Sequence, residues 1–390
     1  MTEVMSQAKG LQEELITYRR YLHKNAEIGF EIPKTYAFVE KALQDMGYTV
    51  EKCGKNALVA TLGRGNCILL RADTDALPMK EQTKLPYKCT CGHMHACGHD
   101  LHTAMLLGGA KLLKKHEKKL KGGVKFLFQP AEEILQGAKN AVENGVLKNP
   151  TVKAAFSMHV ATGTELETGS IVMQKGVGAP SADYFEITVQ GKGCHGSSPW
   201  EGRDPTTVAA RILLGAQELS AREISLKERA VLTVGAFQTG NAGNVIPEKA
   251  VLNGTLRAYD ESTRERIKKR LQEIALNTAK AFNCKAKTTF QGGAPALVND
   301  TALTEFVYRR LQTELGKNKV LLVEKSFGGA SEDFAYIAQE VPSVMVGISA
   351  GAKRQGYEYP LHNSKTTFDE NVLWQGSGIY ASVALGFCAE

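Results

Sequence analysis

Short apolar runs alternate with amphipathic segments over most of this chain. Apolar runs of about four to eight residues predict buried strands, and apolar positions with a period of about 3.6 residues predict helices. We predict helices up to about Lys24 and over 33–46, 101–114 and 135–144, and strands over 57–62, 67–71, 124–129 and 153–158. Because such alternation is typical of a buried parallel sheet covered by helices, this part of the chain predicts an α/β layer.

The order of predicted elements changes from about Tyr184. We predict strands over 184–190, 231–237, 250–259 and 285–290, with helices over 205–219 and 262–282. This order, strand-helix-strand-strand-helix-strand, is that of the split βαβ, ferredoxin-like arrangement. The α/β pattern then resumes with a helix over 300–315, a segment at 332–339, a strand over 343–348 and a closing helix around 372–385.

These patterns predict one domain inserted into another. The predicted fold class is α/β, with a mixed, largely parallel sheet flanked by helices in a discontinuous domain of residues 1–182 and 294–390. Residues 183–293 are predicted to form the inserted ferredoxin-like α+β domain. The chain has 390 residues, which suits two domains at roughly 150 residues each.

The composition excludes several classes of protein. Hydrophobic residues make up 43% and charged residues 23% of the chain, which excludes a disordered protein. The 48 Lys and Arg against 41 Asp and Glu leave a net charge of +7, too mild to indicate nucleic-acid binding. Apolar runs stay shorter than the roughly 18–20 residues that span a bilayer, and the N-terminus lacks a signal pattern. With only eight cysteines, we expect a cytoplasmic protein without a disulfide scaffold or a membrane partner.

The densest polar cluster runs from Cys91 to His102. It reads Cys-Gly-His-Met-His-Ala-Cys-Gly-His-Asp-Leu-His and holds two thiols and four imidazoles. Thiolate and imidazole are the ligands that a borderline divalent metal prefers. A structural zinc site or a redox thiol pair is the alternative, but a closed structural site usually needs a second Cys/His pair. The other cysteines stand alone, so the pattern favours a catalytic metal site.

Further polar residues follow the predicted strands of the α/β layer. Glu132 and Glu133 come after strand 124–129, His159 comes directly after strand 153–158, and Asp73 and Asp75 close strand 67–71. Ligands of α/β proteins bind beyond the carboxyl ends of the strands, so we expect these side chains to converge. One of two adjacent carboxylates can then hold a metal while the other accepts a proton from water. Taken singly, a surface Glu pair or a buried core histidine would explain each group.

Two more histidines lie outside these strand ends. His195 is in a glycine-rich loop at 191–199 of the predicted inserted domain, where it could donate a hydrogen bond to a substrate oxygen. The alternative is a helix-entry turn with an incidental histidine. His362 precedes the last predicted helix and would bring the far end of the chain to the same site.

Nine motifs in this order resemble the M20 family of metallopeptidases and amidohydrolases, and specifically its aminoacylase/hippurate hydrolase branch. The resemblance covers essentially the whole chain. It rests on LRADTDALP at 70–78, MHACGHD at 94–100, QPAEE at 129–133, MHV at 158–160, GCHGSSP at 193–199, NVIP at 244–247, GTLR at 254–257, SEDF at 331–334 and LHN at 361–363.

The resemblance implies a zinc-peptidase-like catalytic domain with two divalent metal ions per chain, of manganese, zinc, cobalt or nickel. The ligands that it implies are Cys97, His99, Glu133, His159 and His362. Glu132 would be the general base and Asp75 would hold the site in register. The inserted domain would be a lid and a homodimer surface, with His195 stabilising the oxyanion, sometimes in the partner's active site. Asn244 and Arg257 would face a substrate carboxylate.

The activity that this resemblance implies is hydrolysis of the amide bond of N-acyl amino acids, such as N-acetyl or N-benzoyl derivatives. A dipeptidase or carboxypeptidase of the same family is the nearest alternative. A non-catalytic metal-binding homologue is a third hypothesis, which the adjacent Glu132 argues against because a binder needs no base. Trp200 stands where the branch commonly has histidine, Cys194 replaces a frequent glycine, and Cys89, Cys91 and His93 enrich the run before the ligands. None of these departures removes a ligand.

Overall fold

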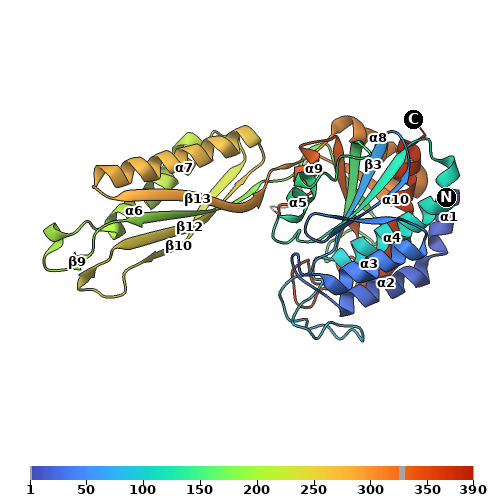
Figure 1. The fold of residues 1–390 in the computed structure, drawn as a ribbon, viewed down its shortest axis with the longest axis horizontal. Helices are drawn as coiled ribbons and strands as arrows, with labels where there is room; N and C mark the ends of the chain where they lie inside the picture. Colours follow the sequence, from blue (N-terminus) through green and yellow to red (C-terminus); the bar gives the residue numbers. More distant parts are fainter. Residues whose placement is uncertain (1, 325–329, 390) are drawn as a thin grey trace. The chain divides into compact units, whose positions relative to one another are not determined.

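The computed structural model describes residues 2–324 and 330–389 and divides into two compact units (Figure 1). The larger unit holds the chain up to Gly178 and most of the chain from Val298 onward, and the smaller unit holds Ala179–Leu297. Among the described helices, none is both long and apolar enough to cross a membrane.

The larger unit is built on a mixed sheet. Within the described residues this sheet has eight strands in the order β1-β2-β4-β3-β5-β16-β6-β15. The strands are β1 Val50–Cys53, β2 Ala57–Gly63, β3 Cys67–Asp73, β4 Gly123–Gln129, β5 Val152–Ala161, β6 Ile171–Gln174, β15 Val320–Val323 and β16 Ser343–Ser349. The central strands β4, β3, β5 and β16 are parallel, and β1, β2 and β6 add antiparallel pairs. The predicted largely parallel α/β sheet is therefore confirmed.

Helices pack closely around this sheet. They are α1 Glu3–Lys9, α2 Gln12–Lys24, α3 Pro33–Asp45, α4 His99–Lys115, α5 Gly137–Glu143, α8 Thr301–Leu315, α9 Ala335–Ala338 and α10 Leu373–Phe387. α4 and α10 lie against each other and against β3. Their approach depends on Gly108, since a Cβ atom there would lie 2.2 Å from the Ser377 hydroxyl oxygen. This contact fixes the position of α4, whose first residue is His99.

Several details of the larger unit differ from the sequence prediction, which did not include the strands β1, β6 and β15. The single predicted N-terminal helix is two helices, because Gly10 ends α1 and glycine is a poor helix former. β5 continues to Ala161, so His159 lies inside the strand rather than after it. The edge strand β1 was missed because Val50–Cys53 reads Val-Glu-Lys-Cys, with little apolar character, and the edge of a sheet needs no more.

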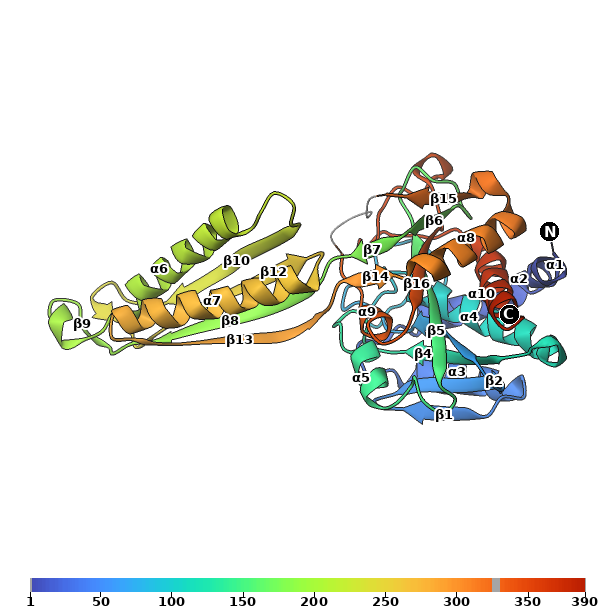
Figure 2. The ribbon, with the colours of Figure 1, turned by 90° about the horizontal axis from the view of Figure 1, so that it is seen from above.

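The smaller unit is an antiparallel sheet covered on one face by two helices (Figure 1). Its elements are β8 Ala182–Gln190, β9 Cys194–His195, α6 Pro205–Glu218, β10 Ala230–Thr239, β11 Val245–Ile246, β12 Lys249–Ala258, α7 Glu261–Ala281 and β13 Lys285–Ala294. The strand order β10-β12-β8-β13 is the predicted ferredoxin-like one. α7 runs lengthwise along this sheet (Figure 2). The aspartates that cap α6 and α7, Asp204 and Asp260, accept from the backbone N–H groups of Thr206 and Thr263.

Two further features complete the fold. A short ribbon pairs β7, Gly176–Ala179, with β14, Leu297–Asn299. Cys89 and Cys91 form a disulfide bond, a pairing that the sequence did not lead us to predict. In the described part of the chain the other cysteines are free.

Candidate metal centre and active site

The five side chains predicted as metal ligands meet at the carboxyl edge of the parallel strands. The Cys97 sulfur lies 3.4 Å from His159 Nε2 and 3.2 Å from His362 Nε2. Glu133 Oε1 lies 3.5 Å from His362 Nε2 and 3.9 Å from His99 Nε2. Residues separated by more than 260 positions thus lie within contact distance, as His362 and Cys97 are 265 positions apart.

Unpartnered buried atoms indicate that this cluster fits a metal. His99 Nε2 and Glu133 Oε1 are buried and have no hydrogen-bond partner among the described residues. Donors that lie about 2.0–2.3 Å from one tetrahedral ion are roughly 3.3–3.8 Å apart, close to the distances between these side chains. Two groups of facing donors share Glu133, namely Cys97-Glu133-His362 and His99-Glu132-Glu133. A shared carboxylate between two donor groups suits a pair of divalent ions.

Hydrogen bonds to the backbone orient the imidazoles of His99 and His159 toward this cluster. His99 donates from Nδ1 to the carbonyl oxygen of Asp75 over 2.8 Å. His159 donates from Nδ1 to the carbonyl oxygen of Val160 over 2.7 Å. In each ring the Nδ1 proton leaves the lone pair of Nε2 facing the cluster, which is the usual way that a second layer of contacts orients a metal-binding histidine.

Special backbone conformations bring Cys97, His99 and His362 together. Gly98 has φ +86°, and a Cβ atom there would lie 2.3 Å from a methyl group of Val160, so only glycine fits between Cys97 and His99. His362 has φ +61° and donates its backbone N–H to the Ala96 carbonyl oxygen over 3.0 Å. This bond ties the loop before α10 to the turn that carries Cys97, and it holds an unfavourable backbone conformation in place.

Asp75 organises the turn that carries the two adjacent glutamates. Its Oδ1 accepts the backbone N–H of Glu132 over 3.0 Å, and its Oδ2 accepts that of Glu133 over 3.2 Å. Ala131, just before this pair, has φ +63°, a left-handed backbone conformation. Glu132 is buried and its Oε2 lies 3.9 Å from His99 Nε2. Asp75 therefore fixes the backbone position of both glutamates. The Glu132 carboxylate lies beside the cluster, where it is well placed to act as a base.

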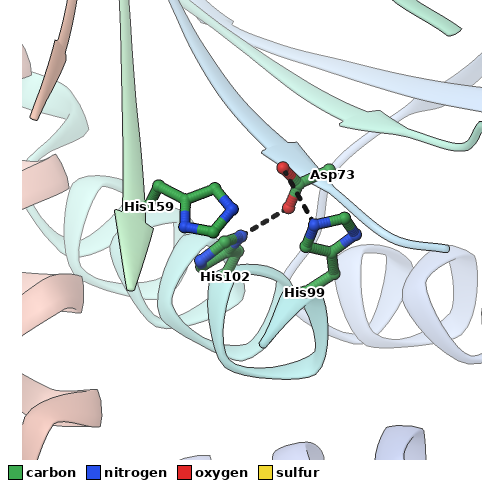
Figure 3. Close-up of side chains that lie close together, drawn as sticks. All are labelled: Asp73, His99, His102 and His159. Atoms are coloured by element: carbon green, nitrogen blue, oxygen red, sulfur yellow. Dashed lines mark hydrogen bonds and ion pairs between the residues drawn. The ribbon is translucent and has the colours of Figure 1, made fainter. Parts of the chain in front are cut away.

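A buried ionic network lies beneath the cluster. Asp73 Oδ2 accepts from Arg71 Nη1 over 2.8 Å, and Asp73 Oδ1 accepts from His102 Nδ1 (Figure 3). Arg71 also donates over 2.8 Å to Asp333, which accepts from the Gln129 amide over 2.9 Å. Sequence reasoning named Asp73 only as an orienting carboxylate and missed the others. The one available signal was a charged Arg71 inside an otherwise apolar strand.

Burial sets the pKa values of the cluster. It raises the pKa of the Glu133 carboxyl to about 7 and that of the Cys97 thiol well above its usual range. Burial also lowers the pKa of His159 to about 3 and, more weakly, the pKa of His362. At His99 burial opposes protonation, but the charge of Asp73 together with the contacts to Cys97 and Asp75 outweighs it and the pKa rises. Burial therefore favours neutral Glu133 and Cys97, which must lose protons before a cation binds.

We expect the affinity for a divalent metal to rise with pH. Below about pH 7 the raised pKa of Glu133 keeps its carboxyl protonated, so a cation must displace that proton, and the Cys97 thiol adds a second. Each displaced proton weakens binding by about tenfold per unit of pH below the pKa of the group. Chelator competition with Zn²⁺ from pH 6 to pH 8 measures this slope. A pH-independent affinity, after correction for the chelator, would contradict it.

The three predicted site residues of the smaller unit do not lie together. His195 pairs with Val245 in the β9–β11 ribbon, and Gly196 donates its backbone N–H to the Asn244 carbonyl oxygen over 2.7 Å. This ribbon lies at one end of the unit (Figures 1 and 2). Arg257 is near the other end of β12, roughly 25 Å along the strand from Lys249. His195 and Asn244 are thus neighbours, and Arg257 is separate from them.

His195 is arranged as a hydrogen-bond donor. Its Nδ1 accepts the backbone N–H of Ser197 over 3.1 Å, and the side chain is exposed. In the neutral ring the proton is then on Nε2, which points away from that bond. Arg257 donates from Nη1 to the Ser331 hydroxyl over 3.3 Å and lies 5.7 Å from the Tyr184 ring centroid.

Comparison with known proteins places the chain in a family. A model of the family described as Peptidase family M20/M25/M40 matches residues 69–386. An N-acetyl-L-cysteine deacetylase of Bacillus subtilis (strain 168) is 34% identical over 372 residues, 94% of this chain and 86% of that protein. The IAA-amino acid hydrolase ILR1-like 4 of Arabidopsis thaliana is 35% identical over 96% of this chain and 86% of that protein. Thermostable carboxypeptidase 2 of Saccharolobus solfataricus is 32% identical over 99% of this chain and 98% of that protein.

Solved structures agree with these relatives. The crystal structure of a dinuclear metal binding peptidase from the M20 family of Bacillus subtilis has a TM-score of 0.80 and 31% identity, covering 97% of this chain and 98% of that chain. A putative aminohydrolase from methicillin resistant Staphylococcus aureus has a TM-score of 0.91 and 30% identity, covering 98% of both chains. The dinuclear relative agrees with the two donor groups that share Glu133. The chain belongs to the M20/M25/M40 peptidase family and is a metal-dependent amidohydrolase with a site for two divalent ions.

Proposed function

We propose that this enzyme hydrolyses the amide bond of N-acyl amino acids to a carboxylate and a free amino acid. The observation that supports the proposal is the position of Glu132. Its carboxylate is buried beside His99, and its backbone N–H is held by Asp75. A metal-binding protein without activity needs no such residue beside its ligands. Two relatives named for acyl-amino-acid substrates, the deacetylase and the IAA-amino acid hydrolase, support the choice of substrate class.

We further propose a role for each site residue. Cys97, His99, Glu133, His159 and His362 would hold two divalent ions, of manganese, zinc, cobalt or nickel, which activate water and polarise the amide carbonyl when bound. Glu132 would accept the proton of the attacking water and return it to the leaving amine. His195 would donate from Nε2 to the carbonyl oxygen as negative charge develops there. Arg257 would pair with the free carboxylate of the substrate, and Asn244 would contact the same carboxylate.

A substrate panel tests the proposed reaction. We expect the metal-loaded enzyme to release amino acid from N-acetyl and N-benzoyl amino acids faster than it cleaves dipeptides of the same amino acids. The two sets share the scissile amide and the carboxylate but differ in a free amino group, which gives a matched comparison. Faster cleavage of the dipeptides would instead favour the peptidase alternative, for which the related carboxypeptidase is the precedent. An absence of hydrolysis across both sets would favour a non-catalytic role.

The proposal includes a homodimer through the smaller unit. Its edge strand β10 exposes the apolar side chains of Val231 and Phe237 at 60% and 39%, and a second copy that pairs with this edge would cover them. A dimer would also supply His195 and Asn244 from one copy and Arg257 from the other, since Arg257 lies near the end of β12 away from the β9–β11 ribbon that holds His195. Analytical ultracentrifugation that finds a monomer at all concentrations would contradict this part. A cytoplasmic location stays a prediction.

A further inference from the structure

His102 lies beside the candidate metal centre but has no free ring nitrogen. Its Nε2 accepts the backbone N–H of Val160 over 2.8 Å, and its Nδ1 donates to Asp73 (Figure 3). The ring is buried, with 1% of its surface exposed, and its centroid lies 4.6 Å from that of His159 at an interplanar angle of 67°. Histidine is a common metal ligand, but both ring nitrogens of His102 are hydrogen-bonded to other groups.

The bonds of His102 belong to a longer chain that ends at His159. Val160, whose N–H donates to His102, accepts the Nδ1 proton of His159 at its carbonyl oxygen over 2.7 Å. These two groups belong to the peptide units on either side of the Val160 Cα atom, so the connection from His159 to the Asp73 carboxylate runs through the Val160 backbone and the His102 ring. Asp73 is itself held by Arg71, which donates to its second oxygen over 2.8 Å.

This series of contacts fixes the Val160 backbone and, through it, the His159 ring. His102, anchored by Asp73, holds the Val160 N–H, and the Val160 carbonyl oxygen holds the Nδ1 proton of His159. Contacts behind a metal-binding histidine fix its tautomer and the orientation of its ring. They direct the Nε2 atom of His159 toward the donor cluster. That atom lies 3.4 Å from the Cys97 sulfur within the donor cluster.

We propose that His102 is a positioning residue that links Asp73 to the Val160 backbone and thereby sets the orientation of the His159 imidazole. The inference rests on the proposed role of His159 as a metal ligand. His102 itself does not ligate, although it belongs to a group of facing donors with Asp73, His99 and His159. Contacts of this kind behind a metal-binding histidine typically change metal affinity or activity by about 10–100-fold when they are lost.

Two substitutions break the chain at different bonds. In His102→Asn the amide nitrogen lies near the position of Nδ1 and can still donate to Asp73, but the Val160 N–H loses its acceptor. In His102→Gln the amide oxygen lies near the position of Nε2 and can still accept from Val160, but Asp73 loses its donor. His116→Gln is the matched control, since His116 caps the far end of α4 and bonds Gln7 through Nε2 over 2.8 Å.

The test uses the purified full-length enzyme, stripped with a chelator and titrated with Co²⁺. We expect both His102 variants to bind two ions per chain, with affinity for one of them reduced by about 10–100-fold and with a shifted visible absorption spectrum at saturating Co²⁺. A purely structural role would lower the melting temperature but leave the saturated spectrum unchanged. We expect kcat to fall at saturating Co²⁺ with KM unchanged, and His116→Gln to match the wild type in all readouts.

The outcomes separate this inference from the proposed site. If both His102 variants keep the affinity and the spectrum of the wild type, the link between Asp73 and His159 is wrong. If only one variant changes, a single hydrogen bond acts alone and the proposed joint role of Asp73 and Val160 is wrong. His159→Ala tests the underlying assignment, because it is expected to lose one of the two ions. If it still binds both with wild-type affinity, the proposed ligand set fails, whatever the His102 variants show.

Discussion

Replacing Glu132 with glutamine is expected to lower kcat by about 10²–10⁴ while two metal ions remain bound. The amide has nearly the shape of the carboxylate but cannot take a proton from water at neutral pH. The Asp75 bond to the Glu132 backbone does not involve the side chain, so the turn should keep its place. Steady-state kinetics with an N-acetyl amino acid, together with metal analysis of the same sample, measures both parts.

A glutamate on the neighbouring helix provides the control. Glu143, at the end of α5, is exposed, and Glu143→Gln removes the same charge without touching the cluster. We expect it to keep the activity of the wild type. If Glu132→Gln were as active as the Glu143 variant, Glu132 would not be the base. If it lost both activity and metal, Glu132 would act chiefly as a ligand, as its group with His99 and Glu133 would allow.

Replacing Asp75 with asparagine is expected to have the second-largest effect, a loss of about 10–100-fold in kcat/KM together with a loss of stability. Both carboxylate oxygens of Asp75 accept backbone N–H groups, from Glu132 and from Glu133. Asparagine offers one acceptor oxygen and turns an NH₂ group toward the other N–H. One buried donor then has no partner, which costs about 1–3 kcal/mol in the free energy of unfolding. Urea denaturation of the metal-free protein measures this cost, and kinetics of the metal-loaded protein measure the effect on the site.

An exposed aspartate controls for the loss of charge. Asp45 ends α3 and pairs with Lys41 over 2.9 Å at the surface, with 64% of its side chain exposed. Asp45→Asn should change the free energy of unfolding by less than about 1 kcal/mol. An Asp75→Asn protein with unaltered kinetics and stability would mean that the turn at 131–133 is fixed by other contacts.

The α/β sheet was predictable because its signal is local. β3 and β4 are buried along their whole length, so apolar residues dominate both strands, and α3 shows its period of about 3.6 in its own residues. The edge strand β1 gave no such signal, since half of its residues are exposed. The end of β5 was misplaced because Met158-His159-Val160 contains a polar residue that only its neighbours in the sheet make compatible with a strand.

The candidate site, like the sheet, could be predicted from the sequence only in part. Cys97 and His99 were found because a dense run of thiols and imidazoles is rare, and Glu132 and Glu133 because carboxylates follow a buried strand. The sequence did not indicate the role of His102, although His102 is in the same run of thiols and imidazoles. Its partners, Asp73 on β3 and the Val160 N–H on β5, come from strands that are 29 and 58 positions away in the sequence.

The sequence by itself determined the layer of helices and strands, the ferredoxin-like order of the smaller unit, and the residue types able to hold a metal. These follow from periodicity and side-chain chemistry, which each segment carries alone. Only the tertiary structure decided which histidines keep a free lone pair. His99 and His159 face the cluster because backbone carbonyl groups occupy their Nδ1 protons, whereas His102 has both nitrogens engaged. That choice depends on hydrogen-bond partners brought in by neighbouring strands, and no local pattern specifies them.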